Sequence, residues 1–224
     1  IACFAGKATE GVGYLERAAT FRGVDRQQEA DARNALGQNL VDLQKDKTYS
    51  YGARGSANEA RFSSGECAIF LTSSGYYGTA KATSKFDFTS APMPYYPDAQ
   101  GAPQNSIIGG ASLWVMGGKS DETYKGVAAF FTYISKTEVQ EYLHQTSGYL
   151  PVTLAAYEAT KASGFYDKNP GRETPITQMM GKAPTANSKG VRLVNMPQVR
   201  DIANEEFEKM LAGELTAQQA LDNA

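Results

Sequence analysis

The sequence predicts an α/β protein in which short strands alternate with helices and the last third is mainly helical. Two observations support this. The apolar runs at 67–71 and 107–116 are strand-sized, whereas longer segments repeat apolar residues at helical spacing. Of the 224 residues, 42% are hydrophobic and 21% are charged, as in ordinary globular proteins. None of the apolar runs approaches the ~18 residues that a membrane-spanning helix needs.

Start and stop signals define the elements along the chain. Ser120 is a good N-cap, Thr216 and Gln219 form a capping box, and Gly148 with Pro151 ends a helix. In chain order we expect a helix at 25–46, a strand at 67–71, a helix at 76–82, an extended crossing segment at 86–93, a strand at 107–116, and helices at 120–134, 138–145, 153–162, 175–180, 197–212 and from 216.

Two of these helices are expected to bury one face. Apolar residues recur at helical spacing in both, between polar positions. The expected buried faces are Tyr124, Val127, Ala128, Phe131 and Ile134 in the helix at 120–134, and Val199, Ile202, Ala203, Phe207, Met210 and Leu211 in the helix at 197–212.

Charge and composition exclude several kinds of site. The formal net charge is -2 without a Lys/Arg cluster, which argues against nucleic-acid binding. One His and two distant Cys do not match the common zinc spacings, so we expect neither a metal nor a cofactor. Cys3 and Cys67 are compatible with one disulfide or with two small buried thiols, and we favour the thiols.

Catalysis has little support in the sequence. His144 is the only imidazole, and Glu141 and Gln145 beside it suggest a solvated helix end rather than a general base. No Gly-x-Ser-x-Gly motif or paired carboxylates accompany it. We therefore expect no catalytic residues.

Binding has more support. The turn at 72–75 follows a strand and precedes a helix, so Ser73 and Ser74 are placed either to bind an anion or simply to cap the helix. Gly110 lies near Trp114, where close approach of a ligand and a β-bulge explain the glycine equally well. Tyr149 follows a helix stop and points either into a cleft or into the core.

A single cation completes the candidate set. Arg200 lies in the first turn of the helix that Pro197 initiates, where a positive charge opposes the helix dipole. Such a position suggests a purpose such as pairing with a phosphate group.

Several long motifs, in order and spacing, resemble one family. They are GECAI at 65–69 with SSG at 73–75, APQNSIIGGASLWVM at 102–116, SGYLP at 147–151, GFYDKNPG at 164–171 and NMPQVR at 195–200. The chain is similar to the periplasmic sn-glycerol-3-phosphate-binding proteins of bacterial ABC importers, within the extracellular solute-binding protein family. The resemblance runs from about Asp46 to the end, and residues 11–28 depart from the family pattern.

The resemblance implies a two-lobed periplasmic-binding-protein fold of type II, of which this chain is the C-terminal half. It also implies that the chain begins inside a longer precursor. We expect residues 1–85 in lobe 2, residues 86–150 in lobe 1, and residues 151–224 as a helical return to lobe 2 and the hinge region.

The resemblance further implies a ligand site and its partners. Ser73, Gly110, Tyr149 and Arg200 match the family's ligand contacts, with Ser74 and Trp114 as possible lining residues. The implied ligand is glycerol-3-phosphate or a glycerophosphodiester, captured in the periplasm by hinge closure and delivered to ABC permease subunits. The missing N-terminal half of the same protein would complete the site. The alternatives are a neutral sugar-binding protein of the same fold and, less favoured, a phosphodiester hydrolase.

Overall fold

The computed structural model describes residues 2–4, 26–54, 56–95, 97, 102–103, 105–106, 108–184 and 194–224. In chain order its elements are β1 (Ala2–Phe4), α2 (Arg26–Lys45), β2 (Tyr49–Ser50), α3 (Glu59–Ser63), β3 (Ile69–Leu71), the 3₁₀ helix η1 (Ser74–Tyr76), α4 (Tyr77–Thr83), α5 (Asp121–Ile134), α6 (Thr137–Ser147), α7 (Leu154–Ala162), α8 (Phe165–Lys168), α9 (Thr174–Met180), α10 (Met196–Ala212) and α11 (Ala217–Asn223). Most of the segment that departs from the family pattern lies outside these residues.

The predicted helices are all present, and their ends follow the predicted caps. The Ser120 side chain accepts a hydrogen bond from the Thr123 backbone at 3.3 Å. Thr216 and Gln219 form the expected capping box of α11. Four elements were not predicted from the sequence, and they are only two to five residues long: β1, β2, α3 and α8. Elements this short carry little periodic signal.

A small antiparallel sheet has the strand order β2-β1-β3. Backbone pairing places Cys3 opposite Phe70. Cys67, just before β3, is buried and disulfide-bonded, and Cys3 is the only other cysteine of the sequence. The preference for two free thiols is therefore wrong. Its cause is the pairing of strands that are far apart in the sequence, which a single sequence does not reveal.

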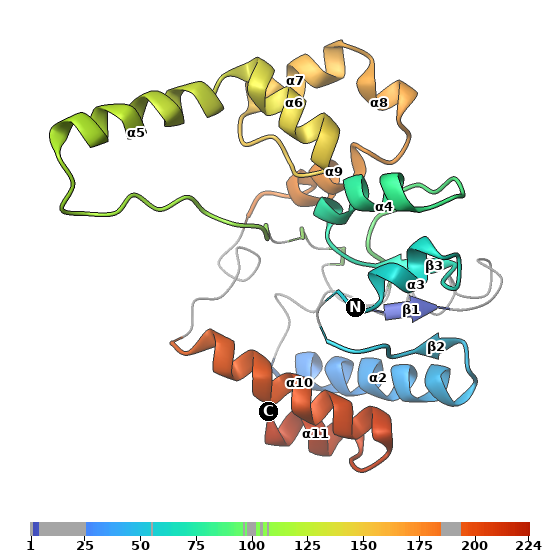
Figure 1. The fold of residues 1–224 in the computed structure, drawn as a ribbon. Helices are drawn as coiled ribbons and strands as arrows, with labels where there is room; N and C mark the ends of the chain where they lie inside the picture. Colours follow the sequence, from blue (N-terminus) through green and yellow to red (C-terminus); the bar gives the residue numbers. More distant parts are fainter. Residues whose placement is uncertain are drawn as a thin grey trace.

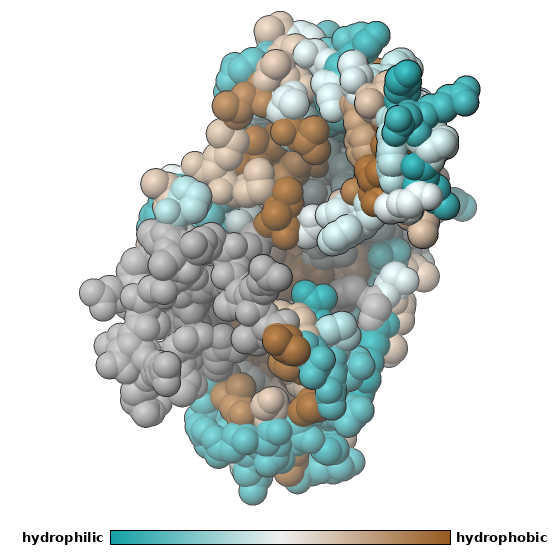
Figure 2. All heavy atoms as spheres, turned by 90° about the vertical axis from the view of Figure 1, so that its left-hand side faces the viewer, coloured by the Kyte–Doolittle hydropathy of each residue, from teal (hydrophilic) through white to brown (hydrophobic). Residues whose placement is uncertain are grey.

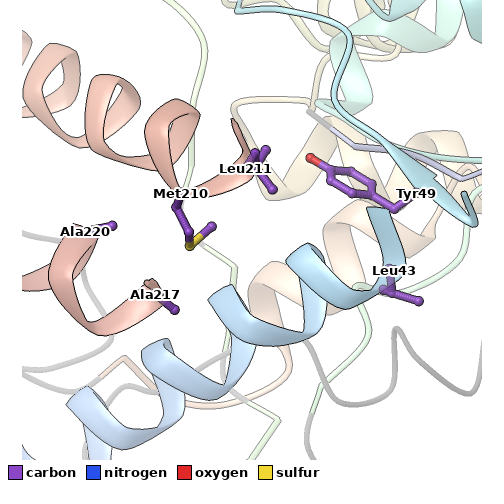
Figure 3. Packing of buried hydrophobic residues seen from close by; sticks show 6 residues of the cluster. All are labelled: Leu43, Tyr49, Met210, Leu211, Ala217 and Ala220. Atoms are coloured by element: carbon purple, nitrogen blue, oxygen red, sulfur yellow. The ribbon is translucent and has the colours of Figure 1, made fainter. Parts of the chain in front are cut away.

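The main hydrophobic core lies where α2 packs against α10 and α11, beneath the sheet in Figure 1. Figure 3 shows its buried side chains, which are Leu43, Tyr49, Met210, Leu211, Ala217 and Ala220. The C-terminal half of the predicted inner face of α10 is confirmed by Met210 and Leu211. At the other end of that helix, Val199, Ile202 and Ala203 are exposed.

Helices α6 to α9 form the upper part of the molecule in Figure 1, and α4 contacts α6. From their N-terminal side, α5 and the extended segment 108–118 project away from the other elements. The predicted strand at 107–116 is not observed, since residues 108–116 are extended without pairing to a strand in the described part of the chain. No residue of α5 is buried, so its predicted buried stripe is also wrong. Tyr124, Val127, Phe131 and Ile134 are half-buried, and Ala128 is exposed.

Candidate functional site

The turn before α4 presents an oriented hydroxyl. Ser73 has extended backbone angles and caps η1, and its Oγ accepts a hydrogen bond from the Gly75 backbone at 3.2 Å. Because a serine hydroxyl both accepts and donates, its own proton remains free to be donated to a ligand oxygen. Ser73 is exposed and Ser74 is half-buried.

The ring of Tyr149 lies between two glycines from different parts of the chain. A Cβ atom on Gly75 would lie 3.1 Å from Cε2 of Tyr149 and 3.5 Å from Oγ of Ser73. On the opposite edge of the ring, a Cβ atom on Gly110 would lie 3.5 Å from Cε1. The structure thus brings together Ser73, Gly110 and Tyr149, with 54% of Tyr149 exposed.

Gly148 allows the segment that carries Tyr149 to lie close to η1 and α4. It ends α6 in the left-handed region with φ of 89°, which favours glycine. A Cβ atom there would overlap the carbonyl oxygen of Ser74 and lie 2.9 Å from Cβ of Tyr77. The segment that carries Tyr149 is therefore packed directly against η1 and α4.

A buried histidine holds the backbone of Tyr149. His144 is 1% exposed, and its Nδ1 lies 2.6 Å from the carbonyl oxygen of Tyr149, while its Nε2 lies 3.0 Å from the hydroxyl of Tyr166. Because a carbonyl oxygen only accepts, Nδ1 carries the proton and Nε2 accepts from Tyr166. Burial lowers the pKa of His144, and the nearby Arg172 guanidinium lowers it further against the opposing effect of the bond to Tyr149.

The predicted solvated position of His144 is wrong. The helix surface on which it lies is covered by α8 and the loop after it, which sequence spacing did not reveal. The expectation that His144 is not a general base stands for a different reason. Both ring nitrogens are engaged within the protein, so neither is available to exchange a proton with a ligand.

Arg172 joins three segments behind Tyr149. Its guanidinium carbon lies 4.0 Å from the centre of the Tyr77 ring and 5.4 Å from that of Phe165. It donates a 2.7 Å hydrogen bond to the carbonyl oxygen of His144 near the end of α6, where a cation is favoured by the helix dipole. Arg172 is 5% exposed, so the interaction is shielded from water.

Two candidate residues lie apart from this cluster. Trp114 is 89% exposed and lines a groove between segment 108–118 and α5. Arg200 is exposed near the start of α10, which lies in the lower part of Figure 1, whereas Tyr149 follows α6 in the upper part.

Three supporting residues gave no sequence signal for their contacts at the site, namely Gly75, Tyr166 and Arg172. Tyr166 belongs to a motif that carried the family resemblance, and Gly75 belongs to the turn that was singled out, but neither pattern indicated a contact with Tyr149. Arg172 follows a motif glycine, Gly171, and gave no separate signal.

The exposed groups at the site suit recognition of a polar small molecule. They comprise a hydroxyl donor, an aromatic ring and the backbone at Gly110, which has φ of 97°. Among the described residues there is no group of His, Cys, Asp or Glu that could hold a metal ion. The helices in the same part of the chain include none long and apolar enough to cross a membrane.

Comparison with known proteins identifies relatives over most of the chain. Residues 4–174 match the family described as bacterial extracellular solute-binding protein. The sn-glycerol-3-phosphate-binding periplasmic protein UgpB of Rhizobium meliloti is 62% identical over 187 residues, which are 84% of this chain and 43% of the relative. The protein of the same name from Yersinia pseudotuberculosis is 49% identical over 185 residues, 83% of this chain and 42% of the relative. The chain thus spans about two fifths of the length of these curated relatives, and the resemblance found in the sequence is confirmed.

Solved structures share the fold. UgpB from Mycobacterium tuberculosis in complex with glycerophosphocholine has a TM-score of 0.72 at 21% identity, over 98% of this chain and 55% of that chain. MalE from Bdellovibrio bacteriovorus bound to maltotriose has a TM-score of 0.61 at 19% identity, over 95% of this chain and 54% of that chain. The predicted periplasmic-binding-protein fold is confirmed, although the described residues contain less sheet than an α/β reading implies.

Proposed function

The chain belongs to the bacterial extracellular solute-binding protein family, and on that premise we propose that it is part of a receptor that captures glycerol-3-phosphate or a glycerophosphodiester. The observation that carries the proposal is the 62% identity to a protein named for binding sn-glycerol-3-phosphate. The relatives are periplasmic proteins, and we place this chain in the same compartment. The disulfide at Cys67 agrees with an oxidising compartment.

The family is one of binding proteins rather than enzymes, as the sequence analysis expected. Captured ligand is therefore released unchanged, and we propose ABC permease subunits as the recipients. Hinge closure of a type II two-lobed fold would enclose the ligand. We propose the division into residues 1–85 and 151–224 in one lobe and residues 86–150 in the other.

Each site residue has a proposed role that fits its chemistry. Ser73 donates its free hydroxyl proton to a phosphate oxygen, and the backbone amide of Gly110 donates to another. Tyr149 covers the ligand with its exposed ring, because that ring lies beside both of these groups. Arg200 pairs with the phosphate through two parallel hydrogen bonds once the lobes close. We also propose Ser74 and Trp114 as lining residues, and the carbonyl oxygen of Ser74 lies against Gly148, the residue before Tyr149.

A neutral sugar is the second candidate ligand, because a maltotriose-bound protein shares the fold at a TM-score of 0.61. Arg200 distinguishes the two, since a neutral sugar has no anionic group to pair with its guanidinium. A phosphodiester hydrolase is the least favoured alternative, because His144 is enclosed by the protein.

Calorimetric titration tests the proposal. The protein to use is a chimera in which this chain replaces the 187 matched residues of the Rhizobium meliloti relative. We expect stoichiometric binding of glycerol-3-phosphate and glycerophosphocholine, weak or no binding of maltotriose, and recovery of intact glycerophosphocholine. Preference for maltotriose would replace the ligand assignment, and release of choline would indicate a hydrolase. We expect the 224-residue chain alone to bind far more weakly, since a cleft between lobes divides its contacts.

A further inference from the structure

A pocket of about 610 Å³, which we call the α3–α4 pocket, lies between α3, α4 and the residues just after α4. Small-molecule sites typically have volumes of about 300–1,000 Å³. The described residues that line the pocket include neither Ser73 nor Tyr149, so it is separate from the candidate functional site. It also lies apart from the hydrophobic surface that Figure 2 shows in the upper half of one face, because that view looks from the left of Figure 1, whereas α3 and α4 lie toward the right.

A cluster of hydroxyl groups lies in the wall of the pocket and is formed by Ser63, Tyr76 and Thr83. The Oγ of Ser63 lies 2.6 Å from the hydroxyl of Tyr76 and 2.9 Å from Oγ1 of Thr83. The hydroxyl of Tyr76 donates to the carbonyl oxygen of Glu59 at 2.8 Å, and that of Thr83 donates to the carbonyl oxygen of Thr79, also at 2.8 Å. These bonds join α3 to η1 and α4, so the hydroxyl oxygens are held in fixed positions.

The hydroxyl cluster has fewer protons than hydrogen-bonding contacts. Each hydroxyl supplies one proton and two acceptor lone pairs, whereas a carbonyl oxygen only accepts. Tyr76 and Thr83 donate their protons to carbonyl oxygens, so the single proton of Ser63 must serve two neighbouring oxygens. One of these two contacts is therefore left without a proton. Because the cluster lacks a donor, the pocket favours a ligand that donates hydrogen bonds.

The remaining lining groups favour a neutral ligand with an apolar face. Glu59 and Lys85 contribute one charge of each sign, so their net charge favours neither an anion nor a cation. Phe86 adds an aromatic ring that is 38% exposed and is held edge-on against Phe62, with the ring centres 5.5 Å apart. An aromatic ring beside hydroxyl groups suits a molecule that has an apolar C–H face and hydroxyls at its edge. A sugar has both features.

We propose that the α3–α4 pocket binds a mono- or disaccharide, as a second site in addition to the one at Ser73, Gly110 and Tyr149. Sugar hydroxyls donate to the hydroxyl cluster around Ser63, and the C–H face of the sugar ring lies against Phe86. The lining residues all fall between positions 59 and 86, so the pocket is formed by one continuous part of the chain. The inference therefore does not depend on which ligand the first site takes.

Methyl NMR of the chimera described above tests the proposal without any substitution. Ala60, Thr79 and Thr83 line the pocket and carry methyl groups, whereas Thr132 on α5 and Ala156 on α7 serve as references. We expect trehalose to shift the resonances of the three lining methyl groups alone, and saturating glycerol-3-phosphate to leave these shifts unchanged. No shift at about 100 mM trehalose, which fills a site with a dissociation constant of about 1 mM, would overturn the proposal. Shifts caused by ethanolamine but not by trehalose would overturn it too, because the cluster would then bind a cation.

Two threonines with the same backbone contact provide a matched pair. Thr83 and Thr132 are both exposed, and each donates to the carbonyl oxygen four residues earlier at 2.8 Å. We expect Thr83→Val to weaken trehalose binding at least ~10-fold, equivalent to about 1.4 kcal/mol, because each remaining contact of the cluster then has its own proton. Thr132→Val should leave binding unchanged. The Ala60 methyl resonance measures the affinity, and the melting temperature shows whether each variant is folded.

A second variant and a variant of the other site complete the test. Ser63→Ala removes the hydroxyl that both neighbours share, so it should also weaken trehalose binding at least ~10-fold. Tyr149→Ala should leave trehalose binding unchanged. Equal effects of Thr83→Val and Thr132→Val would contradict the role of the hydroxyl cluster. Loss of trehalose binding in Tyr149→Ala, with wild-type affinity in Ser63→Ala, would show that the sugar occupies the other site.

Discussion

The Nδ1 of His144 donates a hydrogen bond of 2.6 Å to the carbonyl oxygen of Tyr149, five residues further along the chain. This bond closes the loop between the end of α6 and the ring that lies beside Ser73 and Gly110. Tyr166 fixes the other ring nitrogen, and Arg172 contacts the carbonyl oxygen of His144. The position of Tyr149 therefore depends on residues that are buried behind it.

The burial of His144 predicts that the free energy of unfolding depends on pH. Its pKa in the folded protein is lowered by burial, so between that value and about 6.5 the unfolded chain binds a proton that the folded chain does not. The contribution to the free energy of unfolding is fully present above about pH 6.5 and is lost as the pH falls through this window. Since the chain has one His, an NMR titration follows a single imidazole. Titration at or above 6.5 would contradict the buried neutral form, and His144→Gln should remove the pH dependence in this window.

Arg172 is expected to be important for stability. Arg172→Ala removes a buried charge-assisted hydrogen bond and the contact with the Tyr77 ring, so the free energy of unfolding should fall by about 2–4 kcal/mol in urea denaturation. The free energy of unfolding of Arg172→Lys should lie between those of the wild type and Arg172→Ala, because an ammonium keeps the charge without the planar stacking group. The control is Arg54→Ala, which breaks an exposed ion pair with Glu208 and should have a smaller effect. Equal losses for Arg54→Ala and Arg172→Ala would show that burial does not matter here.

Two glycines test whether contact with η1 constrains the segment of Tyr149. Gly148 and Gly213 both end helices in the left-handed region, at φ of 89° and 82°. Alanine at Gly213 would meet no atom within 4 Å, so we expect only the backbone penalty of about 1–2 kcal/mol. In Gly148→Ala the new Cβ atom would in addition clash with the carbonyl oxygen of Ser74, so the free energy of unfolding should fall by about 1–3 kcal/mol more. Thermal or urea denaturation of the two variants measures this difference, and similar losses would contradict the tight packing.

Arg200 is expected to affect binding rather than stability. If it pairs with the ligand phosphate, Arg200→Ala should weaken binding of glycerol-3-phosphate to the chimera by about 10-fold to 100-fold or more, with Arg200→Lys intermediate. Because Arg200 is exposed, the melting temperature without ligand should change little. Arg54→Ala serves as the charge-matched control and should retain affinity. Wild-type affinity in Arg200→Ala would remove the phosphate assignment.

Local chemistry determined much of the fold. Hydroxyl caps at Ser120 and Thr216 and the positive-φ stop at Gly148 act within a few residues, so the sequence predicted the helices with nearly correct ends. The long motifs also identified the family, because their order and spacing are far more specific than any single turn. Ser73, Gly110 and Tyr149 were named from those motifs, while their roles as ligand contacts remain a prediction.

Only the tertiary structure decided which surfaces are covered. The sequence signals at His144 and Cys67 were compatible with exposure and with a free thiol, and packing from distant segments made the first buried and the second disulfide-bonded. Conversely, residues 111–116 have the composition of a strand but find no neighbouring strand in the described part of the chain. Hydrophobicity and local propensity act within a segment, whereas strand pairing and burial require a partner that is distant in the sequence.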